Sequence, residues 1–132
     1  MKWFVPEEDS EQAKQLKRDY ENGETDITSP QLILFEVANA LRYHPVVRLN
    51  EVDLVTAVES LKDLAIIVEM DRTNWVKTFE LSRTEGISIY DAAYLSLAEL
   101  NGAKFVTADR RFHDGLSAAL KHRVLLLSTL ED

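Results

Sequence analysis

The chain has no cysteine, only four glycines and three prolines among 132 residues, and no long uninterrupted apolar run. Without cysteine, disulfide bridges and a thiolate zinc site are both excluded, and the composition suits a reducing cytoplasm. No stretch has the length and apolarity of a membrane span, and the acidic start MKWFVPEED does not resemble a signal peptide. We therefore expect a cytoplasmic protein with no membrane segment, of a length that fits one domain.

Positive charge is also scarce. Fifteen Lys and Arg residues stand against 23 Asp and Glu residues, which gives a formal net charge of −8. Proteins that hold nucleic acid mainly by neutralising phosphates are normally basic. If this chain acts on nucleic acid, we expect it to use a local basic rim or bound metal cations. The acidity also favours a basic partner protein.

Helical patterns alternate along the chain with short apolar runs of strand length. We expect helices over residues 6–23, 29–44, 50–64, 71–86, 87–102 and 110–122, with Pro30 in the first turn of the second helix. We expect extended or strand segments over residues 26–30, 65–70, 103–109 and 123–129, the third of them buried. Strands separated by helices predict an α/β domain with a mostly parallel sheet covered on both faces.

Capping signals place several helix ends. Asn50 is expected to cap the helix over residues 50–64, while Gly86 and Gly102 close two later helices. Trp75 and Phe79, spaced as WxxxF, are predicted to lie in the core, and surface positions are predicted for the three histidines.

Glu36 lies in SPQLILFEVANALRY, where Leu34, Val37 and Leu41 form an apolar stripe. Residues three apart share a helix face, so Glu36 and Asn39 line a neighbouring stripe. A solvated glutamate beside an asparagine explains this pattern, and it is the favoured interpretation of Glu36 taken alone.

Asp91 and Asp109 each have both a structural and a chemical interpretation. Ser88 and Asp91 have capping-box spacing, and the helix dipole favours an anion there, although the surrounding helix is apolar nearly all round. Asp109 follows the apolar run KFVTA, at the carboxyl end of a strand, where open α/β sheets bind ligands. It could equally cap the next helix. Thr107 and Asp114 flank Asp109 and either support it as a ligand or have no role in the site.

Taken together, the three acids indicate carboxylates delivered to one edge of a parallel sheet. There is no cysteine, no Ser–His pairing and no glycine-rich phosphate loop beside them. Such hard oxygen ligands suit Mg²⁺ or Mn²⁺, and a site of this kind supports metal-assisted hydrolysis of phosphodiesters.

Three segments, SPQLILFEVANAL, SIYDAAYLSLAE and FVTADRRF, resemble the motif regions of PIN domains, in the order and at about the spacing of the VapC toxins. The resemblance covers essentially the whole chain. It implies a PIN-like three-layer α/β/α fold with a mostly parallel sheet, as a single domain over residues 1–132. It also implies a Mg²⁺- or Mn²⁺-dependent ribonuclease of a toxin–antitoxin pair, acting as a homodimer and held by a VapB-like antitoxin protein.

The same resemblance implies roles for individual residues. By matching position, Glu36, Asp91 and Asp109 would be the metal-binding acids, with Asn39 and Thr107 as supporting polar groups. Asp114 falls near an additional acid that some relatives have. Substrate contacts would come from the nearby basic residues Lys104, Arg110 and Arg111, although a solvated charged turn explains these three equally well.

One part of the family pattern is missing. PIN domains begin with a central strand ending in Asp, before the helix that would contain this chain's KWF. Here Glu7, Glu8 and Asp9 come after KWF and cannot substitute by position. We expect an N-terminally truncated domain without its first central strand, through a wrongly assigned start codon or, less favoured, as a truncated paralogue. Metal binding would then be impaired.

Two other functions remain open. A catalytically defective PIN-fold module that engages an antitoxin or another partner would account for the missing acid. An unrelated flavodoxin-like receiver would need an acidic pair after its first strand and a lysine after a late one. FVTAD has an aspartate at that late position, so the receiver is disfavoured.

Overall fold

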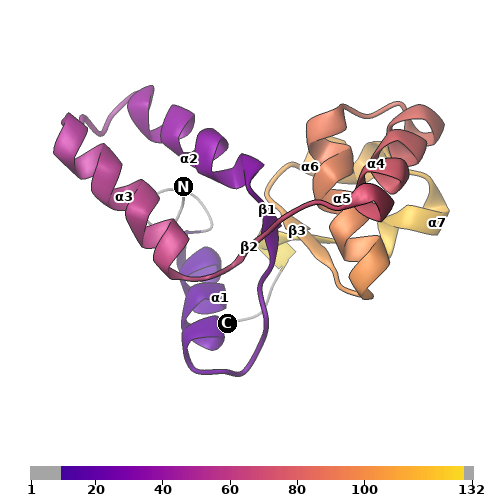
Figure 1. Cartoon of the computed structure of the whole chain (residues 1–132), viewed down its shortest axis with the longest axis horizontal. Helices are drawn as coiled ribbons and strands as arrows, with labels where there is room; N and C mark the ends of the chain where they lie inside the picture. The colour runs from indigo at the N-terminus through magenta and orange to yellow at the C-terminus, as the bar shows by residue number, and fades with distance from the viewer. Residues whose placement is uncertain (1–9, 130–132) are drawn as a thin grey trace. The chain divides into compact units, whose positions relative to one another are not determined.

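The computed structural model describes residues 10–129, and the chain divides into two compact units, residues 1–69 and 70–132. Each unit is taken by itself below. Both combine helices with a short parallel pair of strands (Figure 1). Residues 1–9 lie outside the described part, so the expectations about KWF and the first strand stay predictions. No helix in residues 10–129 has the length and apolarity that crossing a membrane requires.

Over its described residues, 10–69, the first unit has three helices and two short strands. In chain order these are α1 (Ser10–Glu21), β1 (Ser29–Pro30), α2 (Leu32–Arg42), α3 (Glu51–Asp63) and β2 (Ile67–Val68). Strands β1 and β2 pair in parallel, with Ser29 opposite Ile67 and Pro30 opposite Val68. The apolar run 65–70 therefore contributes only two residues to a strand.

Helices α2 and α3 pack against each other and provide most of the core of this unit. Its buried residues are Val37, Leu41, Ala57, Leu61 and Ile66. Val37 and Leu41 belong to the stripe that the sequence predicts, and Asn50 caps α3 as predicted, its side chain accepting from the Asp53 amide at 2.9 Å. Helix α1 is tied to the end of α3 by the Tyr20 hydroxyl, which donates to the Leu64 carbonyl at 2.6 Å.

Two predictions for the first unit are wrong. Ser29 and Pro30 form β1 instead of opening the second helix, since a residue before proline is driven to extended backbone and the Ser29 amide donates to the Ile66 carbonyl at 2.9 Å. His44 is buried, not at the surface. Its Nδ1 accepts the amide protons of Val46 and Val47 at 3.2 and 2.9 Å, so the ring folds the loop after α2 around itself.

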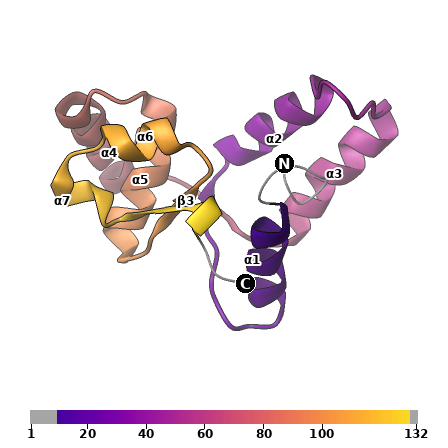
Figure 2. The ribbon, with the colours of Figure 1, turned by 180° about the vertical axis from the view of Figure 1, so that it is seen from behind.

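Between residues 70 and 129 the second unit has four helices and the other parallel pair of strands. Its elements are α4 (Arg72–Glu85), α5 (Ile89–Asn101), β3 (Phe105–Thr107), α6 (Arg110–Gly115), α7 (Ala118–Lys121), β4 (Val124–Leu126) and a 3₁₀ turn, Leu127–Thr129. Helices α4 and α5 lie against each other (Figure 2). Strands β3 and β4 run parallel, with Val106 opposite Leu125. The core comprises Leu81, Ala92, Leu95, Phe112, Leu116 and Val124.

Helix α5 is the buried helix that its apolar sequence predicts. Six of its residues are buried: Ala92, Ala93, Leu95, Ser96, Leu97 and Ala98. Gly86 and Gly102 end α4 and α5 in left-handed backbone, with φ of 66° and 62°, as expected of glycine caps.

Other predictions for this unit are wrong. Trp75 and Phe79 are exposed at 45% and 52%, because the inward stripe of α4 is Asn74, Thr78 and Leu81. Thr78 instead meets α5, its hydroxyl 3.0 Å from that of Ser96. Strand β3 is half-buried, not buried.

The predicted helix over residues 110–122 is broken into α6 and α7. Leu116 and Ser117 adopt extended backbone between the two helices. The break is stabilised from α4, because the Ser117 amide donates to a carboxylate oxygen of Glu85 at 2.8 Å.

Candidate functional site

Asp91 lies in the first turn of α5. Its amide donates to the hydroxyl of the N-cap Ser88 at 3.1 Å, so the helix start itself fixes the backbone of this residue. The side chain is half-buried, in contrast to the exposed Asp53 that occupies the same position in α3. The capping position predicted from the sequence is confirmed, and it leaves the carboxylate facing a partly desolvated environment.

Asp109 follows β3 and begins α6. Its carboxylate accepts from the Phe112 amide at 3.0 Å, which makes it the N-cap of α6, and its own amide donates to the Thr107 hydroxyl at 3.1 Å. Thr107 is the last residue of β3. The residue is therefore held from both sides, by the strand that precedes it and the helix that follows it.

Packing between α5 and β3 brings these two acids into the same neighbourhood. The ring of Tyr94, one helical turn after Asp91, stacks on Phe105 with centroids 5.3 Å apart. Phe105 in turn makes an edge contact with Phe112 of α6, at 5.5 Å. Aromatic contacts of this kind thus connect the first turns of α5 with the start of β3 and with α6.

Asp91 and Asp109 interact electrostatically. Burial raises the pKa of the Asp91 carboxyl above its ordinary value of 3.8, the hydrogen bond with Ser88 opposes this, and the negative charge of Asp109 raises the pKa further. Burial and a neighbouring negative charge both disfavour the ionised form of the Asp91 carboxyl, so a bound cation or proton would stabilise it.

Asp114 is fully exposed on α6, and its carboxylate lies 2.9 Å from Nδ1 of His113. That hydrogen bond, more than any other effect, lowers the pKa of Asp114. The observed partner of Asp114 is therefore a histidine of its own helix.

Glu36 and Asn39 belong to the first unit. Both lie on α2 with exposed side chains, three residues apart, on the helix face predicted for them. The structure thus brings together Asp91, Asp109 and Thr107 in the second unit, while Glu36 and Asn39 share one face in the first.

Within either unit, the described residues include no group of three or more His, Cys, Asp or Glu side chains placed to hold a metal ion. The second unit contributes a pair of acids, and a metal centre with more protein ligands needs a further residue from elsewhere in the chain.

Comparison with known proteins decides the family. The model of the PIN domain matches residues 1–115. The chain belongs to the PIN domain family. Over 118 residues it is also 32% identical to ribonuclease VapC3 of Pyrobaculum aerophilum, an alignment that covers 87% of each protein. The PIN-like α/β fold and the resemblance to VapC proteins are thereby confirmed, and the receiver-like alternative is set aside.

The PIN domain described here has one feature that sequence reasoning missed. A cavity in the first unit is lined by Arg42, Tyr43 and Arg48, around the loop between α2 and α3. One signal could have indicated it: residues 37–50 contain two arginines and a histidine without any acid, in a strongly acidic chain.

Proposed function

We propose that this PIN domain is a metal-dependent endoribonuclease of the VapC toxin type, which hydrolyses RNA phosphodiesters with carboxylate-held Mg²⁺ or Mn²⁺. The observation that supports it best is that Asp109, just after β3, lies close enough to Asp91 in α5 to raise the pKa of the Asp91 carboxyl. The similarity to a named ribonuclease over most of both chains supports the substrate class.

The donor set fits a hard divalent cation. Asp91 and Asp109 provide carboxylate oxygens, and Glu36 is the further acid that the family motif contributes. In this proposal these three residues are the ligands. A divalent cation held there would offset the repulsion between the acids, activate a water for attack on the phosphate and stabilise the leaving oxygen.

The chain's own residues prepare this site. Thr107 fixes the backbone of Asp109 by accepting its amide proton, and Ser88 does the same for Asp91. Because one oxygen of Asp109 already accepts from the Phe112 amide, the carboxylate is oriented before any ligand arrives. In this proposal Asn39 supports Glu36, and Arg111, which is exposed, contacts substrate phosphates. The role of Asp114 is less direct, since its carboxylate is bonded to His113.

The proposal includes protein partners and a cytoplasmic location, where RNA is available. A net charge of −8 favours a basic partner such as a VapB-like antitoxin. Helix α4 presents Trp75, Val76 and Phe79 to the surface, the residue types that protein interfaces use, which supports association with an antitoxin or as a homodimer.

The test is RNA cleavage by the purified 132-residue chain in Mn²⁺, compared with the Asp91→Asn variant. We expect the variant to lose more than about 100-fold of the rate, since removing even outer partners of metal ligands costs about 10- to 100-fold. Asp53→Asn is the matched control, because Asp53 has the same capping position in α3. Cleavage that survives Asp91→Asn or EDTA would contradict the proposal.

A second function, a catalytically defective binding module, is favoured by one observation. Neither unit, over its described residues, assembles three potential metal ligands of its own. Titration calorimetry with Mn²⁺ separates the two functions: heat of binding that disappears in Asp91→Asn supports the nuclease, and no binding heat in the unaltered chain supports the module.

A further inference from the structure

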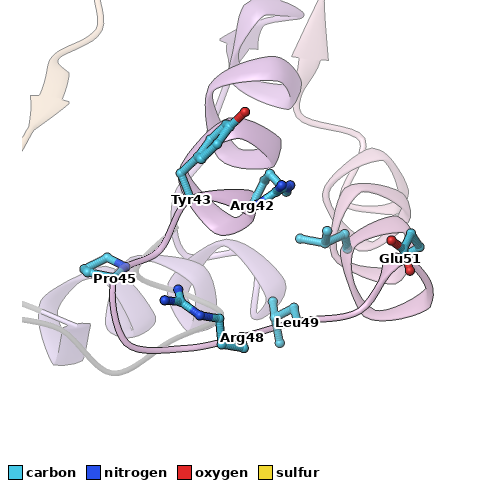
Figure 3. A pocket seen from close by; sticks show the side chains of 7 residues that line it. Arg42, Tyr43, Pro45, Arg48, Leu49 and Glu51 are labelled. Carbon is cyan, nitrogen blue, oxygen red and sulfur yellow. The ribbon is translucent and has the colours of Figure 1, made fainter.

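A cavity of about 460 Å³ opens in the first unit where α2 gives way to α3. Arg42 and Tyr43 border it at the end of α2, Arg48 and Leu49 along the loop, and Glu51 and Leu54 at the start of α3 (Figure 3). All of these residues belong to one unit. The cavity takes no part in the function proposed above.

The lining is cationic in a chain that is acidic overall. The lining contains two guanidinium groups and one carboxylate, that of Glu51. Among the described residues Arg42 has no ion-pair partner, and its guanidinium lies over the Tyr43 ring, 4.8 Å from the centroid. Its hydrogen-bond donors thus remain open to an anion.

The loop that carries these groups is fixed before any ligand binds. Buried His44 accepts the amide protons of Val46 and Val47, and Nη1 of Arg48 donates back to the His44 carbonyl at 2.5 Å. These bonds set the course of the chain from Tyr43 to Arg48. Binding at this loop therefore requires little ordering of the backbone.

Tyr43 indicates which kind of anion fits. Tyr43 is 67% exposed, although the Arg42 guanidinium lies over its ring. An arginine paired with an accessible aromatic ring is the combination with which proteins hold single-stranded nucleic acid, the cation taking the phosphate and the ring a base. A site for an acidic peptide would need the arginines but would not need the exposed ring.

We propose that the cavity bordered by Arg42, Tyr43 and Arg48 is an anchoring subsite for single-stranded RNA, in which Arg42 binds a phosphate and Tyr43 stacks on a neighbouring base. This inference rests on the proposed ribonuclease function and extends it, by placing a substrate contact on the first unit. Glu51 opposes phosphate binding and sets an upper limit on the affinity.

The experiment measures binding without cleavage. Fluorescence anisotropy with a labelled oligouridylate, in EDTA, compares the unaltered chain with Arg42→Gln and with Arg83→Gln. Arg83 is the matched control, an exposed arginine in the last turn of α4 as Arg42 is in the last turn of α2. We expect Arg42→Gln alone to weaken binding several-fold and to reduce the dependence of log affinity on log salt concentration by about 0.7.

Three further variants make the assignment specific. Tyr43→Ala should weaken binding at least about fivefold while Tyr43→Phe preserves it, since stacking needs only the ring. Glu51→Gln should tighten binding, because it removes the one negative charge of the lining. Circular dichroism melting of each variant shows that the chain is folded, so a loss of binding in a folded variant is due to the site.

Equal effects of Arg42→Gln and Arg83→Gln would overturn the inference, as would an unchanged affinity in Tyr43→Ala. If Arg42→Gln weakened the binding of a polyglutamate peptide but not that of RNA, the cavity would be a peptide site and the inference would also be overturned. The two proposals fail separately. RNA binding that depends on Arg42 in a chain that never cleaves RNA would contradict the nuclease alone, whereas cleavage with no effect of Arg42 on binding would contradict the subsite alone.

Discussion

The carboxylate of Asp109, at the start of α6, raises the pKa of Asp91, in the first turn of α5, although 17 residues of sequence separate them. The interaction exists because α5 packs on β3 through Tyr94 and Phe105. It links two residues that each also have an ordinary capping role. Helix caps occur elsewhere in the chain as well. The feature particular to the starts of α5 and α6 is the effect of Asp109 on the pKa of Asp91.

Asp109→Asn is expected to lower the pKa of Asp91, because it removes the nearby negative charge. The pKa should stay at or above the ordinary 3.8, since burial is the largest cause of the shift and is unaffected. Carbon-detected NMR titration of the side-chain carboxyl measures this directly. Asp114→Asn is the control, because Asp114 lies in the same helix and does not contribute to the shift. An unchanged pKa in Asp109→Asn would show that the two groups are not coupled.

Asp91→Asn is expected to stabilise the metal-free chain at neutral pH. The folded state raises the pKa of Asp91, so it binds this proton more tightly than the unfolded state does. The contribution of Asp91 to stability therefore decreases as pH rises from 3.8 through the raised folded pKa.

The substitution removes that loss, and we expect a gain in the free energy of unfolding at neutral pH that vanishes toward pH 3. The gain is small, because solvent screens a partly exposed carboxylate. Urea unfolding in EDTA at several pH values measures it. A variant that is less stable than the unaltered chain at neutral pH would refute this account of Asp91. Gain of stability together with loss of cleavage would show that the acid is kept for function.

Thr107→Val is expected to weaken Mn²⁺ binding by about 10- to 100-fold, because the Asp109 amide loses the hydroxyl that fixes it. Thr107→Ser should restore the affinity. Thr84→Val, which removes a helical hydroxyl bond to the Glu80 carbonyl, is the control and should leave the affinity unchanged. Calorimetric titration with Mn²⁺ gives the comparison, and equal losses in Thr107→Val and Thr84→Val would mean that Thr107 does not position the ligand.

Ala65→Gly is expected to stabilise the chain by about 0.5–1 kcal/mol. Ala65, between α3 and β2, has φ of 58°, a left-handed conformation that costs a residue with a β-carbon free energy and glycine almost none. We expect a net gain because the strain that glycine relieves in the folded chain is larger than the conformational entropy that it adds to the unfolded chain. Ala103→Gly is the control, an exposed alanine without positive φ, and it should be neutral or destabilising. Urea midpoints of the two variants decide the matter, and no gain for Ala65→Gly would contradict the strain.

Much of the candidate site could be read before the structure. Ser88 and Asp91 have capping spacing, and Asp109 follows an apolar run, so their places at the starts of helices were predictable from local chemistry alone. Their proximity was not, because it depends on how α5 lies against β3. The metal roles of Glu36, Asp91 and Asp109 stay predictions that come from the family motif.

The errors in the first and second units have the same origin. Trp75 and Phe79 are apolar, yet the partner of α4 is α5, whose small residues and Ser96 select the neighbouring stripe with Thr78. Ser29 and Pro30 look like a helix start, but pairing with Ile67 and Val68 makes them a strand. In both cases a contact distant in sequence overrode a local preference.

The sequence by itself determined where most helices begin and end, since caps and glycines act within a few residues of backbone. It also determined the family, through three motifs in order. Only the tertiary structure decided which faces are buried, that Asp109 lies close enough to Asp91 to raise its pKa, and that Arg42 at the end of α2 and Arg48 in the following loop border a cavity. These properties depend on distances through space, which packing sets and residue spacing alone does not encode.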